Sequence, residues 1–117
     1  MIECLFFTCL ILNSGLMEQL ESVYQEVGEN EFVGYVDEEH FYHQGTQTIN
    51  GKIIWINKDL DLLEMNGKTI IHSHPNNTIN NLFGLICRPS KKDFMAKELL
   101  GGKTQYLYCG SGRLISF

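Results

Sequence analysis

The sequence predicts a single mixed α/β domain, in which a curved sheet has helices packed on it. Apolar runs typical of strands alternate along the chain with segments whose apolar residues recur at helical spacing. The length of 117 residues fits one domain, and the hydrophobic fraction of 44% is enough for a core without disulfides or a structural metal. We therefore expect residues 1–117 to form one domain.

The apolar stretch at residues 1–12 has about the length of the apolar region of a signal peptide. It has no basic residues ahead of the apolar run, carries Glu3 instead, and is too short to span a bilayer. We therefore expect a strand at 5–12 that is buried on both faces, rather than a leader or a membrane anchor.

A helix should follow this strand, because apolar residues recur there on one helical face. They are Leu16, Leu20, Val23, Tyr24 and Val27. Asn13 or Ser14 can cap the start of the helix, and Gly28 can end it.

The remaining elements are predicted from strand-like runs and from the turn residues between them. Strands are expected at 31–36, 52–57, 68–74, 105–109 and 113–117. Residues 38–47 should be a strand end followed by a loop, and 76–89 shows no regular pattern. A second helix is expected at 90–100, with Ser90 as its N-cap.

The acidic composition argues against a nucleic-acid partner. The chain has fourteen Asp and Glu residues and nine Lys and Arg residues, which gives a net charge of −5 and a pI of about 5.2. A local patch of Arg88, Lys91, Lys92 and Lys97 could still contact an acidic group.

The four cysteines contain no Cys-x-x-Cys pair, which argues against a zinc knuckle or a redox centre. Cys4, Cys9 and Cys109 lie in apolar runs, where a buried free thiol is the expected state. Free thiols favour a reducing compartment, so a cytoplasmic location is expected.

His72 and His74 are the centre of the predicted functional site. They are two residues apart on the predicted strand 68–74, so both side chains leave the same face near its C-terminal end. Pro75 ends the strand and leaves this end open. Catalytic zinc typically has three protein ligands and one open position for water.

Asp93 is the predicted third zinc ligand, because it is the only acidic residue between His74 and Glu98. It falls in the first turn of the predicted helix, from which it can point back to the strand end. Two neutral imidazoles and one carboxylate leave a net positive charge at the metal, which lowers the pKa of a bound water towards ~7.

Two further residues are predicted to take part in hydrolysis. Glu31, at the start of a strand, can accept a proton from the water and pass it to the leaving amine. Ser90 can donate its hydroxyl to the oxyanion, a role worth roughly 3 kcal/mol in other enzymes.

These residues together resemble the JAMM metalloprotease motif of the JAB/MPN domain family. The resemblance rests on Glu-x-x-Gly at 31–34, His-Ser-His-Pro at 72–75 and Ser-x-x-Asp at 90–93, and it covers nearly the whole chain. It implies an α-β-α sandwich around a curved mixed sheet, similar to that of cytidine deaminases. It also implies one zinc ion on His72, His74 and Asp93, with Glu31 as acid/base and Ser90 at the oxyanion.

The family resemblance also implies a substrate class. Members are isopeptidases that remove ubiquitin or ubiquitin-like proteins, and bacterial and phage relatives act on smaller or less well-defined amide substrates. The short chain fits a small prokaryotic or phage-type member. A peptide or a ubiquitin-like protein is therefore the expected substrate.

The chain departs from the family in the spacing between Pro75 and Ser90, where fourteen residues, 76–89, form a longer connection than usual. This connection is rich in apolar residues for a loop. It could act as a flap that contacts substrate or a partner. It could also displace Ser90 and Asp93 and leave an inactive scaffold or binding module.

The same residues are also compatible with different roles. Ser-x-x-Asp before an apolar run is also a helix capping box. Two histidines and one carboxylate also form the facial triad of non-haem iron oxygenases, although that leaves Glu31 without a role. A DNA-repair-associated branch of JAB-like domains fits the acidic charge less well. His40 and His43 are expected in a polar loop or edge strand, not in a second metal site.

Overall fold

The computed structural model describes residues 13–49, 52–55 and 68–117. The strand predicted at 5–12 and the last two residues of the strand predicted at 52–57 lie outside these ranges, as do Cys4 and Cys9.

Six strands form one mixed sheet in the order β3-β2-β1-β4-β5-β6. They are β1 (Phe32–Val36), β2 (Tyr42–Ile49), β3 (Lys52–Trp55), β4 (Thr69–Ser73), β5 (Tyr106–Gly110) and β6 (Arg113–Ser116). Neighbouring strands are antiparallel except β4 and β5, which are parallel. A parallel pair needs a long crossover connection, and here it contains α4 (Thr78–Leu82) and α5 (Lys91–Leu99).

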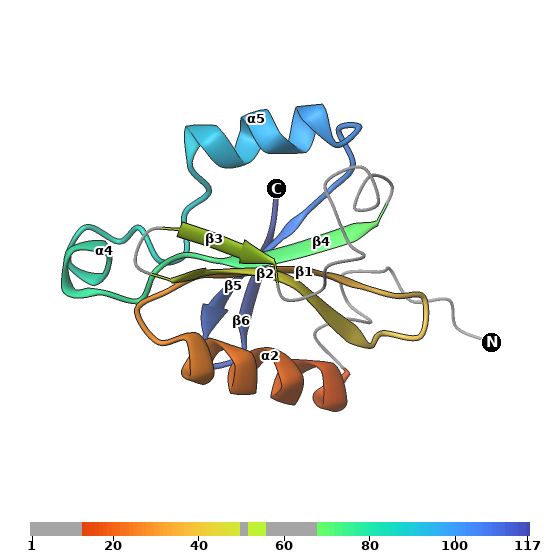
Figure 1. Cartoon of the computed structure of the whole chain (residues 1–117), viewed down its shortest axis with the longest axis horizontal. Coiled ribbons are helices and arrows are strands. Elements are labelled where there is room, and N and C mark those ends of the chain that lie inside the picture. Colours follow the sequence, from red (N-terminus) through yellow and green to blue (C-terminus); the bar gives the residue numbers. More distant parts are fainter. Residues whose placement is uncertain (1–12, 50–51, 56–67) are drawn as a thin grey trace.

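The helices lie on both faces of the sheet, with α2 (Ser14–Val27) on one face and α5 above the other (Figure 1). The cap predicted for α2 is present, because the Asn13 side chain accepts the Leu16 N–H at 2.9 Å. Gly28 ends the helix at a positive φ of 56°. The predicted α/β class, a mixed sheet with helices packed on it, is confirmed.

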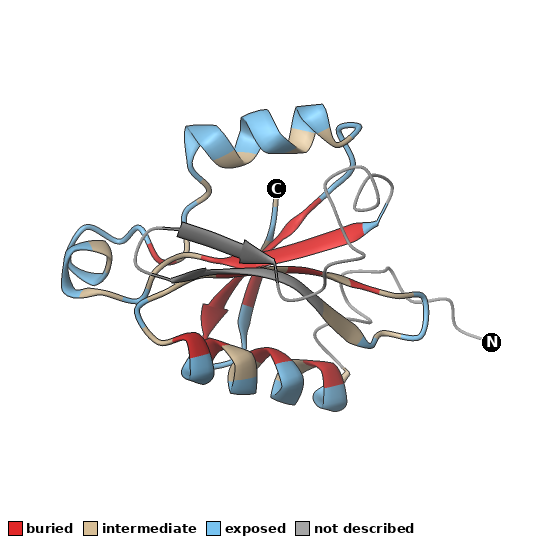
Figure 2. Cartoon of the chain, viewed as in Figure 1, coloured by how far each residue is buried: buried red, intermediate tan, exposed pale blue. Residues whose placement is uncertain are grey.

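The main core lies between α2 and the sheet. The buried side of α2 faces the strands, whereas α5 is exposed or intermediate along its length (Figure 2). The apolar face predicted for α2 packs on buried strand residues. These contacts include Leu16, Leu20, Tyr24 and Val27 of the helix with Phe32, Ile71 and Tyr108 of the sheet. The fold therefore does not depend on α5 for its principal core.

Two segments differ from the sequence expectation. Residues 42–49 form a full strand, β2, where a strand end and loop were expected, because pairing with both β1 and β3 satisfies its polar backbone. Residues 78–82 form the short helix α4 within the connection expected to be irregular. Asn77 caps it by accepting the Asn80 N–H at 2.8 Å.

The two histidines near β2 are His43, on the strand, and His40, in the turn before it. His43 lies on β2, an interior strand rather than the expected edge strand or loop. Its Nε2 lies 2.8 Å from Asp37 Oδ2, and its ring stacks on Tyr35. His40 lies in the turn before β2, with φ of 66°.

The expectation that Cys109 is a free thiol is wrong, because Cys109 forms a disulfide with Cys87. Cys87 lies in the crossover connection between α4 and α5 and Cys109 lies on β5, and their Cα atoms are 5.0 Å apart. The pairing removes the support that free thiols gave to a reducing compartment. In the described part of the chain, no helix combines the length and apolarity needed to cross a bilayer.

Gly34 provides a test of the packing in β1. The β1–β2 register shifts between Val33 and Gly34, and a Cβ atom at Gly34 would overlap the His43 carbonyl oxygen and the Tyr42 ring. We therefore expect Gly34→Ala to lower the free energy of unfolding by about 1–3 kcal/mol. Denaturant unfolding followed by circular dichroism measures this.

Gly15→Ala is the matched control, because the added Cβ would meet only Asn13 Oδ1, at an ordinary 3.5 Å. We expect no loss of stability there, since alanine has the higher helix propensity. Equal unfolding midpoints for the two variants would contradict the packing described for β1.

Candidate metal centre

His72 and His74 lie at the C-terminal end of β4, on the sheet face covered by α5. The antiparallel register pairs Val33 of β1 with His72. Glu31 directly precedes β1 and His74 directly follows β4, so the antiparallel pairing of these strands places both residues at the same end of the strand pair. The charge of Glu31 acts on His74, which agrees with this placement.

Asp93 reaches this strand end from the first turn of α5. The chain leaves β4 at its C-terminal end, so α5 begins above that end before it returns towards the start of β5 (Figure 1). Ser90 and Asp93 form the predicted capping box. The Ser90 N–H donates to Asp93 Oδ2 at 2.7 Å, and the Asp93 N–H donates to Ser90 Oγ at 3.2 Å. The cap thus fixes the orientation of the carboxylate.

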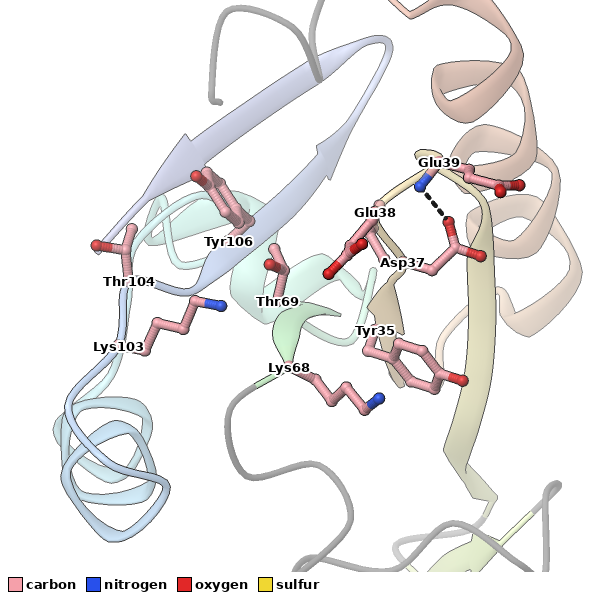
Figure 3. Close-up of a pocket in the computed structure, with 10 residues that line it drawn as sticks. Tyr35, Asp37, Glu38, Glu39, Lys68, Thr69, Lys103, Thr104 and Tyr106 are labelled. Carbon is pink, nitrogen blue, oxygen red and sulfur yellow. Dashed lines mark hydrogen bonds between the residues drawn. The ribbon is translucent and has the colours of Figure 1, made fainter. Parts of the chain in front are cut away.

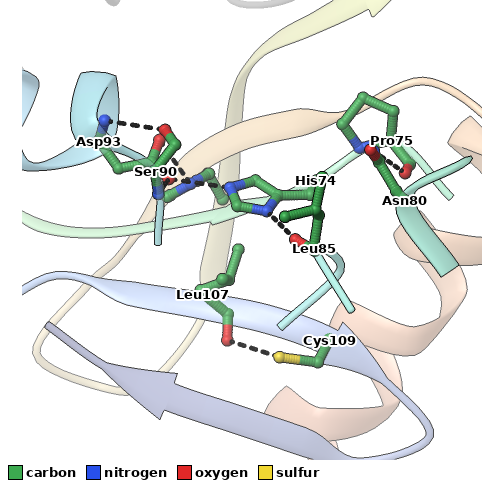
Figure 4. A network of polar contacts seen from close by, with 9 residues as sticks. His74, Pro75, Asn80, Leu85, Ser90, Asp93, Leu107 and Cys109 are labelled. Atoms are coloured by element: carbon green, nitrogen blue, oxygen red, sulfur yellow. Dashed lines mark hydrogen bonds and ion pairs between the residues drawn. The ribbon is translucent and has the colours of Figure 1, made fainter. Parts of the chain in front are cut away.

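The structure brings the three predicted ligands together. Asp93 Oδ1 lies 3.2 Å from His72 Nε2. Asp93 Oδ2 lies 2.8 Å from His74 Nε2 (Figure 4). One potential ligand atom from each residue lies within 4.8 Å of the others. The side chains are 9%, 12% and 17% exposed for His72, His74 and Asp93, so all three are largely buried.

The contacts of His74 call for a cation at Nε2. Its Nδ1 lies 2.6 Å from the Leu85 carbonyl oxygen, which can only accept, so Nδ1 carries a hydrogen. Its Nε2 faces the Asp93 carboxylate, which is also an acceptor when ionised. A neutral imidazole has one N–H and cannot satisfy both acceptors. Nε2 must therefore bind a proton or a metal ion.

His72 supplies a second argument for a metal ion. Its Nε2 is buried and makes no hydrogen bond, although Asp93 Oδ1 is only 3.2 Å away. A buried polar atom without a partner is costly, and a shared metal ion would satisfy it. Two imidazoles and one carboxylate can hold zinc, and they can equally hold non-haem iron.

The pKa values of His74 and Asp93 reflect the same arrangement. Burial acts to lower the pKa of His74, but its hydrogen bonds to Asp93 and Leu85 and the charges of Asp93 and Glu31 outweigh burial, so its pKa is raised. Burial acts to raise the pKa of Asp93, but contacts with His72, His74 and the Ser90 N–H outweigh it and hold that pKa far below its usual range. Asp93 is therefore ionised whenever the protein is folded near neutral pH.

Two neighbours of the site were not found from the sequence. The Phe117 ring meets His72 edge-on at 5.7 Å and Phe94 of α5 at 5.6 Å, which forms an apolar wall beside the imidazole. The Leu85 carbonyl belongs to the connection 76–89, which the sequence suggested could displace Ser90 and Asp93. Instead this connection contacts His74, and Asp93 lies against both histidines.

A separate cavity of about 840 Å³ lies at the other end of β4 (Figure 3). Its lining includes Lys68, Thr69, Asp37 and Tyr106, and Lys68 lies over the Tyr35 ring, 5.3 Å from its centroid. Neither His72, His74 nor Asp93 lines this cavity. This cavity therefore does not coincide with the candidate metal centre.

No protein family model matches the chain, and comparisons with curated proteins and with solved structures gave no significant match. The residues of the metal centre and their geometry are therefore the basis for assigning a function.

The His74–Asp93 pair predicts a pH dependence in protein freed of metal by a chelator. Asp93, with its lowered pKa, contributes stability above its unfolded value near 3.8 and loses it as the pH falls. His74, with its raised pKa, contributes stability below 6.5 and loses it as the pH rises through the folded value. The stability advantage of wild type over Asp93→Asn should therefore be largest between pH 3.8 and 6.5.

Urea unfolding of both proteins across this range measures the advantage. Glu98→Gln, which changes an acidic residue later in α5, serves as the control for general charge effects. A difference between wild type and Asp93→Asn that stays constant with pH would contradict the ion pair.

Proposed function

We propose that this protein is a zinc-dependent metallopeptidase or isopeptidase of JAMM type, with a JAB/MPN fold, that hydrolyses an amide bond. The observation that carries the proposal is the pair of contacts that the His74 ring makes. Nδ1 donates to the Leu85 carbonyl and Nε2 faces the Asp93 carboxylate, so a cation is required at Nε2. The buried Nε2 of His72, which lies 3.2 Å from Oδ1 of the same carboxylate, favours a metal ion as that cation.

His72, His74 and Asp93 would hold the zinc ion. Zinc there would polarise an amide carbonyl and lower the pKa of a water molecule.

Glu31 is the proposed proton carrier. It directly precedes β1, at the end of the strand pair where His74 follows β4, and its charge acts on His74. Its carboxylate would accept a proton from the attacking water and return it to the leaving amine. In this role Glu31 stays close to the zinc ligands without being one of them.

Ser90 is proposed to stabilise the oxyanion. Its Oγ accepts the Asp93 N–H as a helix cap, which uses a lone pair and leaves the hydroxyl hydrogen to donate. Capping the helix and donating to an oxyanion are therefore compatible roles for one hydroxyl.

A polypeptide substrate fits the surface beside the centre. Ile79, Leu82 and Phe83, on or next to α4, are exposed apolar residues in the connection that contacts His74. Exposed apolar side chains grouped beside a catalytic centre suit an extended peptide or a ubiquitin-like protein. A catalytically inactive scaffold is the alternative, and the contact of the long connection with His74 weighs against it.

Glu31→Gln tests the catalytic proposal. The three ligands remain, so the variant should still bind one zinc ion per chain, while turnover should fall about 100-fold or more because the proton carrier is lost. Hydrolysis of fluorogenic peptide and isopeptide substrates, with zinc content measured on the same samples, separates the two effects.

Glu26→Gln is the matched control, because it removes the same charge from an exposed position on α2. It should keep both zinc and turnover. Wild-type turnover in Glu31→Gln would show that Glu31 is not the proton carrier. Zinc binding without any hydrolysis by wild type would favour the scaffold.

A further inference from the structure

We propose that the Cys87–Cys109 disulfide holds the Leu85 carbonyl against His74, and so makes metal affinity at this centre depend on the redox state of the disulfide. The inference rests on the proposed zinc site. It assigns positioning roles to a backbone carbonyl and to a disulfide, neither of which would contact the metal.

The Leu85 carbonyl oxygen is the one hydrogen-bond partner described for His74 Nδ1, at 2.6 Å (Figure 4). By accepting the Nδ1 hydrogen it fixes the tautomer and the ring orientation that present Nε2 to a metal. Hydrogen-bond partners of this kind change metal affinity by about 10–100-fold when they are removed.

The disulfide anchors the segment that carries this carbonyl. Cys87 follows Leu85 by two residues, and Cys109 lies on β5, the strand beside β4. Ile86, between Leu85 and Cys87, is buried in a cluster with Leu107 and Cys109. Leu107 is in register with His72, so the anchor and the ligand strand belong to one rigid part of the sheet.

The segment before Leu85 is held by weaker contacts. The Leu85 N–H donates to the Asn80 carbonyl at 2.8 Å, and the Asn80 side chain donates to the Pro75 carbonyl at 2.7 Å. Gly84, between Asn80 and Leu85 in the chain, adopts a φ of +66°, in the left-handed region. α4 itself has no buried residues, so the covalent link is the strongest constraint on residues 83–87.

Reduction of the link requires a dithiol. One thiolate of the reductant attacks Sγ of Cys87, which is half-buried where Cys109 is fully buried. The Sγ–Sγ bond breaks, and Cys109 leaves as a thiolate that takes up a proton. The second thiol of the reductant then displaces Cys87 from the mixed disulfide. Two electrons and two protons pass to the protein, and the reductant leaves as a disulfide.

Reduction should weaken metal binding rather than abolish it. Ile86 remains in its apolar cluster, so the carbonyl is loosened and not removed. The three ligands and the capping box of Asp93 are unchanged.

The first test compares zinc affinity in oxidised wild type and in the Cys87→Ser/Cys109→Ser variant, by competition with a chromophoric chelator. Serine does not bind zinc as a thiolate does, so the variant reports the loss of the link alone. We expect zinc affinity to fall about 10-fold or more while circular dichroism shows the same fold. Adding reductant to the variant should cause no further change, which controls for Cys4 and Cys9.

A second pair of variants keeps the disulfide intact. Gly84→Ala strains the turn that presents the Leu85 carbonyl, because its φ is +66° and nothing lies near the new Cβ. Gly112→Ala imposes the same kind of strain in the β5–β6 turn, with φ of +74° and equally open space. Only Gly84→Ala should weaken zinc binding.

Nitrogen-15 NMR of the zinc-loaded imidazoles adds a direct signature. The Nδ1 hydrogen of His74 should be protected from exchange in the oxidised protein and should lose that protection in the double variant.

The outcomes separate this inference from the proposed function. Equal zinc affinity in oxidised wild type and the folded double variant, or in Gly84→Ala and Gly112→Ala, would overturn the positioning role and leave the zinc site intact. If the double variant does not fold, the two glycine variants decide. If folded, oxidised wild type binds no zinc, both the proposed function and this inference fail.

Discussion

The contact of one imidazole with two hydrogen-bond acceptors is the constraint on which the candidate site depends. His74 offers Nδ1 to the Leu85 carbonyl and Nε2 to the Asp93 carboxylate, and a neutral ring can satisfy only one of them. The ring must therefore hold a second proton or share a metal ion with Asp93. Since His72 Nε2 is buried beside the same carboxylate without a hydrogen bond, a shared metal ion satisfies both histidines at once.

Those parts of the fold and site that depend on short-range patterns could be predicted from the sequence. The period of a strand puts His72 and His74 on one face, and Ser90 with Asp93 forms the capping box that orients the carboxylate. The apolar face and the N-cap of α2 could be predicted in the same way. The crossover between parallel strands then places the start of α5 above the end of β4, which brings the local features together.

The features that could not be predicted are contacts between distant segments or contacts of the backbone. No sequence pattern marks the backbone carbonyl of Leu85 as a partner of His74. Cys87 pairs with Cys109 only because the crossover connection passes close to β5. β2 has no apolar alternation in its sequence, so the pattern does not reveal a strand that pairs with both β1 and β3. The long connection looked like a disruption of the site, yet its backbone provides a partner for His74.

Metal content per chain, measured by plasma mass spectrometry on wild type and on His74→Ala, is the most direct test of a shared metal ion at this centre. We expect about one zinc ion in wild type and almost none in the variant, which should stay folded because the main core lies on the other face of the sheet, against α2. A folded wild-type protein that takes up no zinc, even when zinc is added in excess, would contradict the metal site. It would mean that His74 is held as a protonated ion pair with Asp93.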